Sequence, residues 1–224
     1  ANSGTAGTVY VSGAFGKLSM GDVDGASHAA AGNVDGVGLT GLSDLNELAF
    51  LGDGGADMVL FDASFAGDDA ITTDPSLLYE YSTGALTIYA SVNQLNYTMP
   101  VVGYDTNRGM GIAAAYTLDS YKLSIGYDMV EIQDGATTWD IDQVTVGADA
   151  TLGAVVLKAR YATGGVDGTN GFEQDNDQWA VSATYTADAL SLTAFVSNQD
   201  FSQTGVSVVE REAYGLGASY ALGG

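Results

Sequence analysis

The chain has 224 residues and no cysteine, and six lysines and arginines face 28 aspartates and glutamates, a formal net charge of −22. The absence of cysteine excludes disulfides and thiolate metal sites, and so negative a chain would repel a nucleic-acid backbone. Nowhere do about 18 apolar residues follow one another, which excludes a transmembrane helix. Two prolines, 31 glycines and 13 tyrosines favour strands and turns, so the length fits one large all-β domain.

Segments of about ten residues with strictly alternating apolar and polar side chains recur along the chain. In residues 85–93, for example, Leu86, Ile88 and Val92 lie on one face of a strand and polar side chains lie on the other. This pattern predicts eleven strands, at residues 7–13, 16–22, 75–83, 85–93, 108–118, 120–131, 140–151, 153–163, 177–187, 189–200 and 210–222.

The predicted connections alternate between two lengths. Tight turns are expected at residues 13–16, 83–84, 119, 152–153 and 188, and long polar loops at 23–74, 94–107, 132–139, 164–176 and 201–209. Turns at one rim and loops at the other are typical of an up-and-down β-barrel of the outer membrane, with the turns in the periplasm. Strands of about ten residues also match a tilted membrane span.

A soluble antiparallel barrel or sandwich is the alternative, because its strands also alternate, with the apolar face turned inward. Against it, the polar face consists of small or polar residues throughout. Aromatic residues also gather near strand ends, as in the girdles of membrane barrels: Tyr79, Tyr81, Tyr116, Tyr121, Tyr127, Trp179, Tyr185, Tyr214 and Tyr220.

Three segments resemble general diffusion porins of purple bacteria and other alphaproteobacteria. They are Val9-Tyr-Val-Ser-Gly-Ala-Phe-Gly-Lys-Leu-Ser-Met-Gly-Asp22, Asp74-Pro-Ser-Leu-Leu-Tyr-Glu-Tyr-Ser82 and Tyr214-Gly-Leu-Gly-Ala-Ser-Tyr220. The resemblance implies an antiparallel transmembrane β-barrel in the outer membrane of a Gram-negative bacterium, built as a homotrimer. Because that family has sixteen strands, residues 1–224 are expected to form a single, incomplete barrel domain, truncated at both ends.

The resemblance further implies that residues 23–74 fold into the channel as a constriction loop. Its carboxylates would set the field in the pore: Asp24, Asp35, Asp44, Glu47, Asp53 and Asp57. Helix-starting spacing in residues 43–47 predicts a short helix within this loop. Lys158 and Arg160 share the polar face of one strand and should face the lumen, because charge on the lipid face is costly; Lys17 and Lys122 follow tight turns and are also predicted to line the pore.

No cofactor is required by this interpretation. The resemblance also makes calcium near this loop a candidate, which the hard oxygen ligands of Asp53, Asp57, Asp68 and Asp69 would suit, and solvated acidic side chains are the alternative. The expected partners are outer-membrane lipid and lipopolysaccharide, small polar solutes and ions, and two further copies of the chain. Since clefts of one sign concentrate counterions, the charge of −22 predicts preference for cations.

Two other functions compete with a passive channel. An enzyme would need a nucleophile with its base or a metal cage, yet His28 is the sole histidine and lies in a Gly/Ala-rich stretch without a Gly-x-Ser-x-Gly elbow; His28 is interpreted as a pore-wall residue. An acidic surface protein, either an adhesin or a calcium-binding β-roll, would share the high Asp and Gly content. Such chains show a repeat unit, and these strands share only their alternation.

Overall fold

The computed structural model describes residues 7–37, 44–51, 72–73, 76–96, 107–134, 136–203 and 206–221. Its long strands form one antiparallel sheet in which each pairs with the next along the chain, which confirms the predicted meander. They are β1 (Thr8–Gly13), β2 (Gly16–Gly21), β4 (Ser76–Thr83), β5 (Leu86–Asn96), β6 (Asn107–Leu118), β7 (Tyr121–Asp134), β8 (Thr137–Leu152), β9 (Val155–Gly168), β10 (Glu173–Ala187), β11 (Leu190–Gln203) and β12 (Val206–Tyr220). A two-residue strand, β3 (Thr72–Thr73), pairs with β5.

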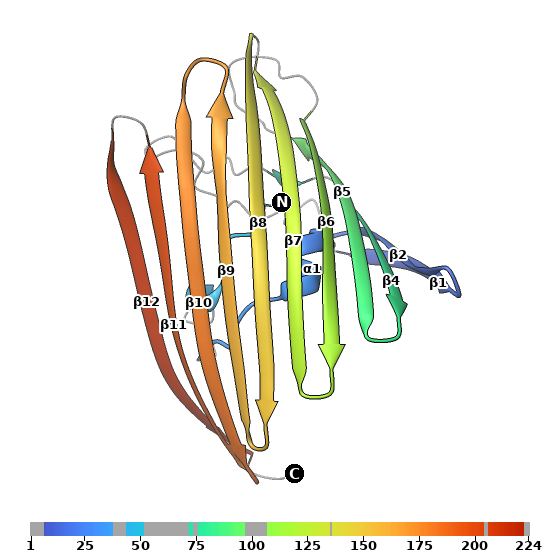
Figure 1. The fold of residues 1–224 in the computed structure, drawn as a ribbon, viewed down its shortest axis with the longest axis vertical. Coiled ribbons are helices and arrows are strands. Elements are labelled where there is room, and N and C mark those ends of the chain that lie inside the picture. The colour runs from blue at the N-terminus through green and yellow to red at the C-terminus, as the bar shows by residue number, and fades with distance from the viewer. Residues whose placement is uncertain are drawn as a thin grey trace.

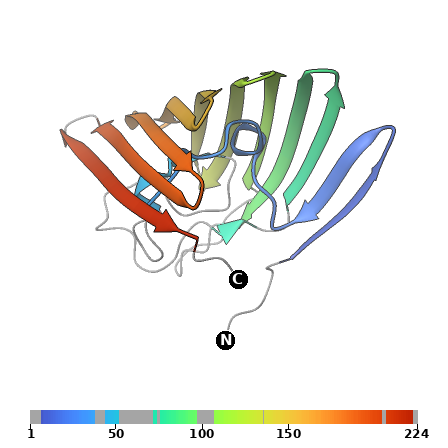
Figure 2. The same ribbon diagram turned by 90° about the horizontal axis from the view of Figure 1, so that it is seen from below.

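The strands stand side by side in Figure 1, and the sheet curves strongly across them. Seen from below, the sheet forms a trough, the shape of a barrel wall, as Figure 2 shows. The helix α1 (Ala26–Ala31) and the single 3₁₀ turn η1 (Asp44–Asn46) lie on its concave side. The short helix expected at residues 43–47 is therefore this 3₁₀ turn, whereas α1 was not predicted.

One end of the sheet carries the predicted tight turns. Two-residue connections join β1 to β2, β4 to β5, β6 to β7, β8 to β9 and β10 to β11. Two of these turns place an aspartate in the left-handed region, with φ 47° at Asp119 and 50° at Asp188. Aspartate tolerates this conformation better than most residues because its short side chain can hydrogen-bond locally.

The other end differs from the prediction at three places. Long loops were expected at residues 132–139, 164–176 and 201–209, but the flanking strands continue to Asp134, Gly168 and Gln203 and resume at Thr137, Glu173 and Val206. The prediction was wrong because it followed the apolar face, which ends at the membrane boundary. Backbone pairing needs no apolar outward face, so the strands extend beyond it.

Burial in this sheet is the reverse of that in a soluble barrel. The largest fully buried side chains among the described residues are polar, and include Gln143, Gln178 and Thr145. Large apolar side chains on the convex face are instead exposed, for example Ile112 at 64% and Leu123 at 60%. Because exposed apolar area in contact with water is costly, this arrangement fits a wall with lipid outside and rules out the soluble alternative.

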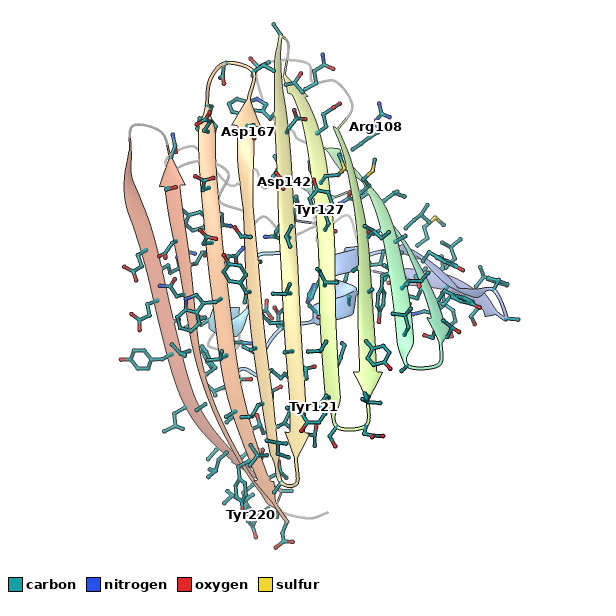
Figure 3. The ribbon with its side chains drawn as sticks, viewed as in Figure 1. Arg108, Tyr121, Tyr127, Asp142, Asp167 and Tyr220 are labelled. Carbon is teal, nitrogen blue, oxygen red and sulfur yellow. The ribbon has the colours of Figure 1, made fainter. Side chains whose placement is uncertain are left out.

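Side chains on the convex face change in kind along the strands. Tyr121 and Tyr220 lie toward the end with the tight turns in Figure 3, and Tyr127 lies toward the opposite end. Beyond Tyr127, toward the end opposite the tight turns, come the charged residues Arg108, Asp142 and Asp167. Apolar side chains bounded by tyrosines and then by charge are the pattern of a membrane-spanning barrel.

Helix α1 packs on strands β5 to β7 from inside the trough. Its sequence, Ala-Ser-His-Ala-Ala-Ala, carries small side chains that let it approach the wall closely. Gly126 of β7 makes this possible, because a Cβ there would lie 2.2 Å from the Ser27 Oγ. Within the described residues, no helix has the length and apolar character needed to cross a membrane.

Candidate pore constriction

Residues 23–37 and 44–51, which belong to the predicted constriction loop, contact the inner face of the wall through apolar side chains. Ala26 and Ala30 pack on Ala113 and Ala115 of β6. Val34, Leu48 and Phe50 form a second cluster with Ala162 of β9 and Ala180 of β10, and Leu51 joins a third with Val130, Ile141 and Val166. In the second cluster small wall residues receive the larger side chains of the loop, and the three clusters together fix the loop against the wall.

Asp35 is held by two strands. Its Oδ1 lies 2.6 Å from the Nζ of Lys158 on β9, and its Oδ2 accepts a hydrogen bond of 2.9 Å from Thr184 on β10. Its backbone N–H donates to Ser182 at 2.9 Å. The side chains of Lys158 and Asp35 are both 27% exposed, so this ion pair is only partly shielded from the water of the lumen.

Arg160 is the most deeply buried cation for which an ion pair is described. Its side chain is 2% exposed, its Nη1 lies 2.6 Å from Asp149, and its Nε donates to the Gly32 carbonyl at 2.7 Å. Gly32 caps the C-terminal end of α1, where carbonyls lack partners in the helix and positive charge is favourable. One guanidinium thus fixes the end of α1 to the β8–β9 wall.

Two buried glutamines hold the backbone at Ala49. Gln178 accepts from the Ala49 N–H at 2.8 Å and donates to its carbonyl at 2.9 Å. Gln143 donates to the same carbonyl at 2.9 Å and accepts from the Leu51 N–H at 3.0 Å. The glutamines stand on β8 and β10, and on β9 between these strands Ala162, 0% exposed, pairs with Gln178 while Gly164 pairs with Gln143. The side-chain amides of the two glutamines thus supply the hydrogen bonds that a neighbouring strand would otherwise give to the backbone of the loop.

His28 also packs within this region. Its ring stacks on Phe50, with centroids 4.4 Å apart, and its Nε2 lies 3.3 Å from the Asn33 Nδ2. Asp24 is 3.8 Å from the other ring nitrogen, and its own side chain is 61% exposed. The Asp24 side chain is thus largely exposed beside α1.

The other predicted pore residues lie at separate places. Lys17 of β2 forms an ion pair of 2.7 Å with Glu80 of β4, close to the tight turns. Lys122 is half-buried on β7. Asp44 belongs to η1, and Glu47 follows it and lines a pocket with β10 to β12. The predicted acids and bases that the structure describes are therefore spread along the wall, and within that set Asp35 and Lys158 are in direct contact.

The predicted calcium ligands Asp53, Asp57, Asp68 and Asp69 lie outside the described residues, so calcium stays a prediction. Among the residues that are described, no three His, Asp or Glu side chains are grouped closely enough to hold a metal ion.

Sequence reasoning did not single out Gln143, Gln178 or Asp149. A signal was present, because each lies on the inward face of a predicted strand. Glutamine is common on water-lined walls, however, and its contact with one loop residue 129 positions away leaves no local pattern. Arg160 was predicted to face the lumen, but its role in holding α1 required the position of the helix.

Taken together, the geometry defines a class of protein. The wall is apolar outside and polar inside, its strands are long and antiparallel, and a loop is anchored to its inner face. These are the features of a pore-forming β-barrel of the outer membrane, because a polar interior of this kind holds a water-filled channel.

Comparison with known proteins identifies the family. Residues 1–224 match the Gram-negative porin family over their whole length. A porin of Rhodobacter capsulatus is 34% identical over 241 aligned positions, which cover 100% of this chain and 73% of that protein. The chain belongs to the Gram-negative porin family, and forms a channel for passive diffusion in the bacterial outer membrane, as predicted.

Solved structures agree with this assignment. A refined porin structure superposes with a TM-score of 0.74 at 33% identity, covering 97% of this chain and 71% of that one. OmpT of Vibrio cholerae, in a trimer form, superposes with a TM-score of 0.58 at 17% identity over 95% of this chain and 79% of that one. The OmpT likeness shows the shared fold alone.

Proposed function

We propose that the channel prefers cations. The chain carries 28 acidic side chains against six lysines and arginines, and three of those six are already compensated in the described structure. Lys17, Lys158 and Arg160 each lie within 2.7 Å of a carboxylate oxygen. Compensated cations contribute little field to the lumen, so the excess of carboxylates dominates it; among them Asp24 has a side chain that is 61% exposed. The pairing of the wall cations is the observation that carries this proposal.

The test is the reversal potential of the protein, isolated from outer membranes, across a planar bilayer with a salt gradient. We expect a reversal potential of the sign given by cation-selective channels. The reversal potential should become smaller at high salt, because screening shortens the range of the field from the carboxylates. Asp24→Asn should lower the cation preference, whereas Asp119→Asn, in a turn at the rim, should change it less. A potential of the anion-selective sign would contradict the proposal.

We also propose that the protein assembles as a homotrimer and contacts phospholipid and lipopolysaccharide. The exposed apolar face of the sheet supports the lipid contact. At the end of the sheet opposite the tight turns, carboxylates stand next to one another on neighbouring strands. Asp140 of β8 pairs with Asp167 of β9, and Asp167 pairs with Glu173 of β10. Like charges directly opposite one another repel, and divalent cations shared with lipid phosphates would relieve this repulsion.

These partners can be tested separately. Mass measurement in mild detergent should give three copies per particle, and a single copy would refute the trimer. Thermal stability in vesicles that contain lipopolysaccharide should fall when a chelator removes Mg²⁺, and vesicles of neutral phospholipid should show no such fall. Equal responses in both vesicles would refute the lipopolysaccharide contact.

We further infer that the chain is not an enzyme. The R. capsulatus relative is named a porin. The sole histidine, His28, stacks on Phe50 beside the anchored loop, an arrangement that serves packing better than proton transfer to a substrate.

A further inference from the structure

A pocket opens between the constriction loop and the wall at β10 to β12. Its volume is about 170 Å³. Two cross-strand pairs that share the inward face lie on its wall side, Ser197 with Ala213 and, two residues further along, Gln199 with Arg211. The loop contributes residues 45 and 47–49. The pocket therefore lies beside the constriction and is bounded by two elements that are far apart in sequence.

The loop side of this pocket is held in place. Ser197 donates a hydrogen bond of 2.6 Å to the Leu45 carbonyl, and Gln178 accepts from the Ala49 N–H. Gln199 in turn donates to Gln178 at 3.4 Å. Because both flanks of the loop segment are bonded to the wall, the pocket is already formed before any solute enters.

Charges of both signs line the pocket. Arg211 stands on the wall, and Glu47 stands on the loop. Arg211 makes no salt bridge to any residue that the structure describes, unlike Lys17, Lys158 and Arg160. Its guanidinium can therefore offer paired N–H donors to a carboxylate that comes from solution.

The remaining lining residues restrict the solute further. Leu45, Leu48 and Ala49 supply apolar surface, and Gln199 and Ser197 supply polar groups. A volume of 170 Å³ is below the roughly 300–1,000 Å³ of pockets for drug-sized ligands. The fitting solute is small, carries a carboxylate for Arg211 and an ammonium for Glu47, and has a short apolar part.

We propose that this pocket is a weak binding site for small zwitterionic solutes, the α-amino acids, beside the diffusion path. The proposal rests on the channel function but not on cation preference. Weak binding suits such a position, because a solute must enter the site readily and also leave it. The site would raise the local concentration of amino acids at the constriction over that of neutral solutes of equal size.

The experiment measures the conductance of the protein, isolated from outer membranes, in planar bilayers while L-alanine is added. Glycerol, uncharged and similar in size, serves as the reference solute. L-alanine should lower the conductance saturably, and glycerol should act only in proportion to viscosity. Arg211→Gln and Glu47→Gln should each raise the half-saturating L-alanine concentration on the order of two- to five-fold, the effect of one exposed charge pair.

Arg108→Gln is the matched control, since it removes the same charge from an exposed position on the convex side of β6. It should leave the L-alanine response unchanged. Unaltered response in Arg211→Gln, with normal openings in salt alone, would overturn the site and leave the channel function standing. Equal responses to L-alanine and acetate would also overturn it, because a plain anion site would explain both. Absence of any openings would refute the channel itself.

Discussion

On the outward side of strands β8 to β10, side chains such as Val144, Val146 and Val181 are apolar, and each is more than a third exposed. On the inward side of the same strands, Gln143, Arg160 and Gln178 are at least 96% buried, and each bonds particular atoms of the loop. Lipid needs only an apolar surface, whereas the loop needs donors and acceptors at fixed positions.

The two faces therefore tolerate change differently. An outward residue can be exchanged for another apolar residue, because lipid adapts to its shape. An inward residue of the loop-contact region, defined here as Gln143, Lys158, Arg160 and Gln178, cannot be exchanged without leaving a loop group unpaired. Variants on the inward face should consequently change both the stability of the protein and its pore, whereas apolar exchanges on the outward face should change neither.

The largest effect is expected at Arg160. Arg160→Met removes the partner of Asp149 and the donor to the Gly32 carbonyl, which should destabilise the protein by about 3–5 kcal/mol, as for other broken buried pairs. Denaturant unfolding in detergent micelles measures this. Arg108→Met, exposed on the convex side, should stay within about 0.5 kcal/mol.

A double variant tests the cause of that loss. Arg160→Met combined with Asp149→Asn leaves no uncompensated charge, so it should recover part of the stability lost in Arg160→Met. If the double variant is less stable than Arg160→Met, the ion pair is not the reason for the effect.

A charge on the lipid face should have the next largest effect. Val181→Lys places an ammonium among apolar side chains of β10, at a cost of about 2–4 kcal/mol near the midplane. Thr193→Lys places the same group on the inward face of β11, beside Thr184, and should cost less than about 1 kcal/mol. Unfolding in lipid vesicles compares the two, and equal losses would mean that β10 and β11 do not separate lipid from water.

The outward face of the sheet could be predicted from the sequence because the alternation of apolar and polar residues that defines it lies within each strand. A strand is predicted from spacing alone by the alternation of Leu86, Ile88 and Val92. The constriction loop was predicted because the segment around Phe15, which precedes it, resembles the corresponding segment of porins. The strand ends at 132–139, 164–176 and 201–209 were missed for the same reason, since they lack the regular apolar alternation of the spans and pairing there is a property of the backbone.

The inward face could not be predicted to the same depth. The sequence indicates that Lys158 and Arg160 face the lumen, but it does not say that one binds Asp35 and the other the end of α1. Those contacts span more than 120 positions and depend on how closely Gly126 and Ala162 let the loop approach. Helix α1 was missed because six residues are too few for a helical signal, and packing on the wall stabilises it.

The glutamines should show a smaller effect than Arg160. Gln178→Ala leaves the Ala49 N–H without its partner, at a cost of about 1–3 kcal/mol, and should alter single-channel conductance because the loop moves. Gln143→Ala should cost more when Gln178 is already replaced, since both donate to the Ala49 carbonyl, which then loses its last side-chain donor. Gln133→Ala, exposed near the end of β7, is the control, and strict additivity would show that the two glutamines act independently.

The smallest change in stability is expected at Lys158. Lys158→Met breaks the pair with Asp35, but both side chains are 27% exposed, so screening by water limits the loss to about 1 kcal/mol or less. The pore should nevertheless respond, because the Asp35 carboxylate is then left uncompensated in the lumen and should shift the reversal potential toward stronger cation preference. Lys158→Met/Asp35→Asn restores the balance of charge and should return the potential close to its original value. If Lys158→Met alone left the potential unchanged, then the Asp35 carboxylate would lie too far from the ion path to influence it, and the loop contacts at β9 would serve only to hold the loop in place.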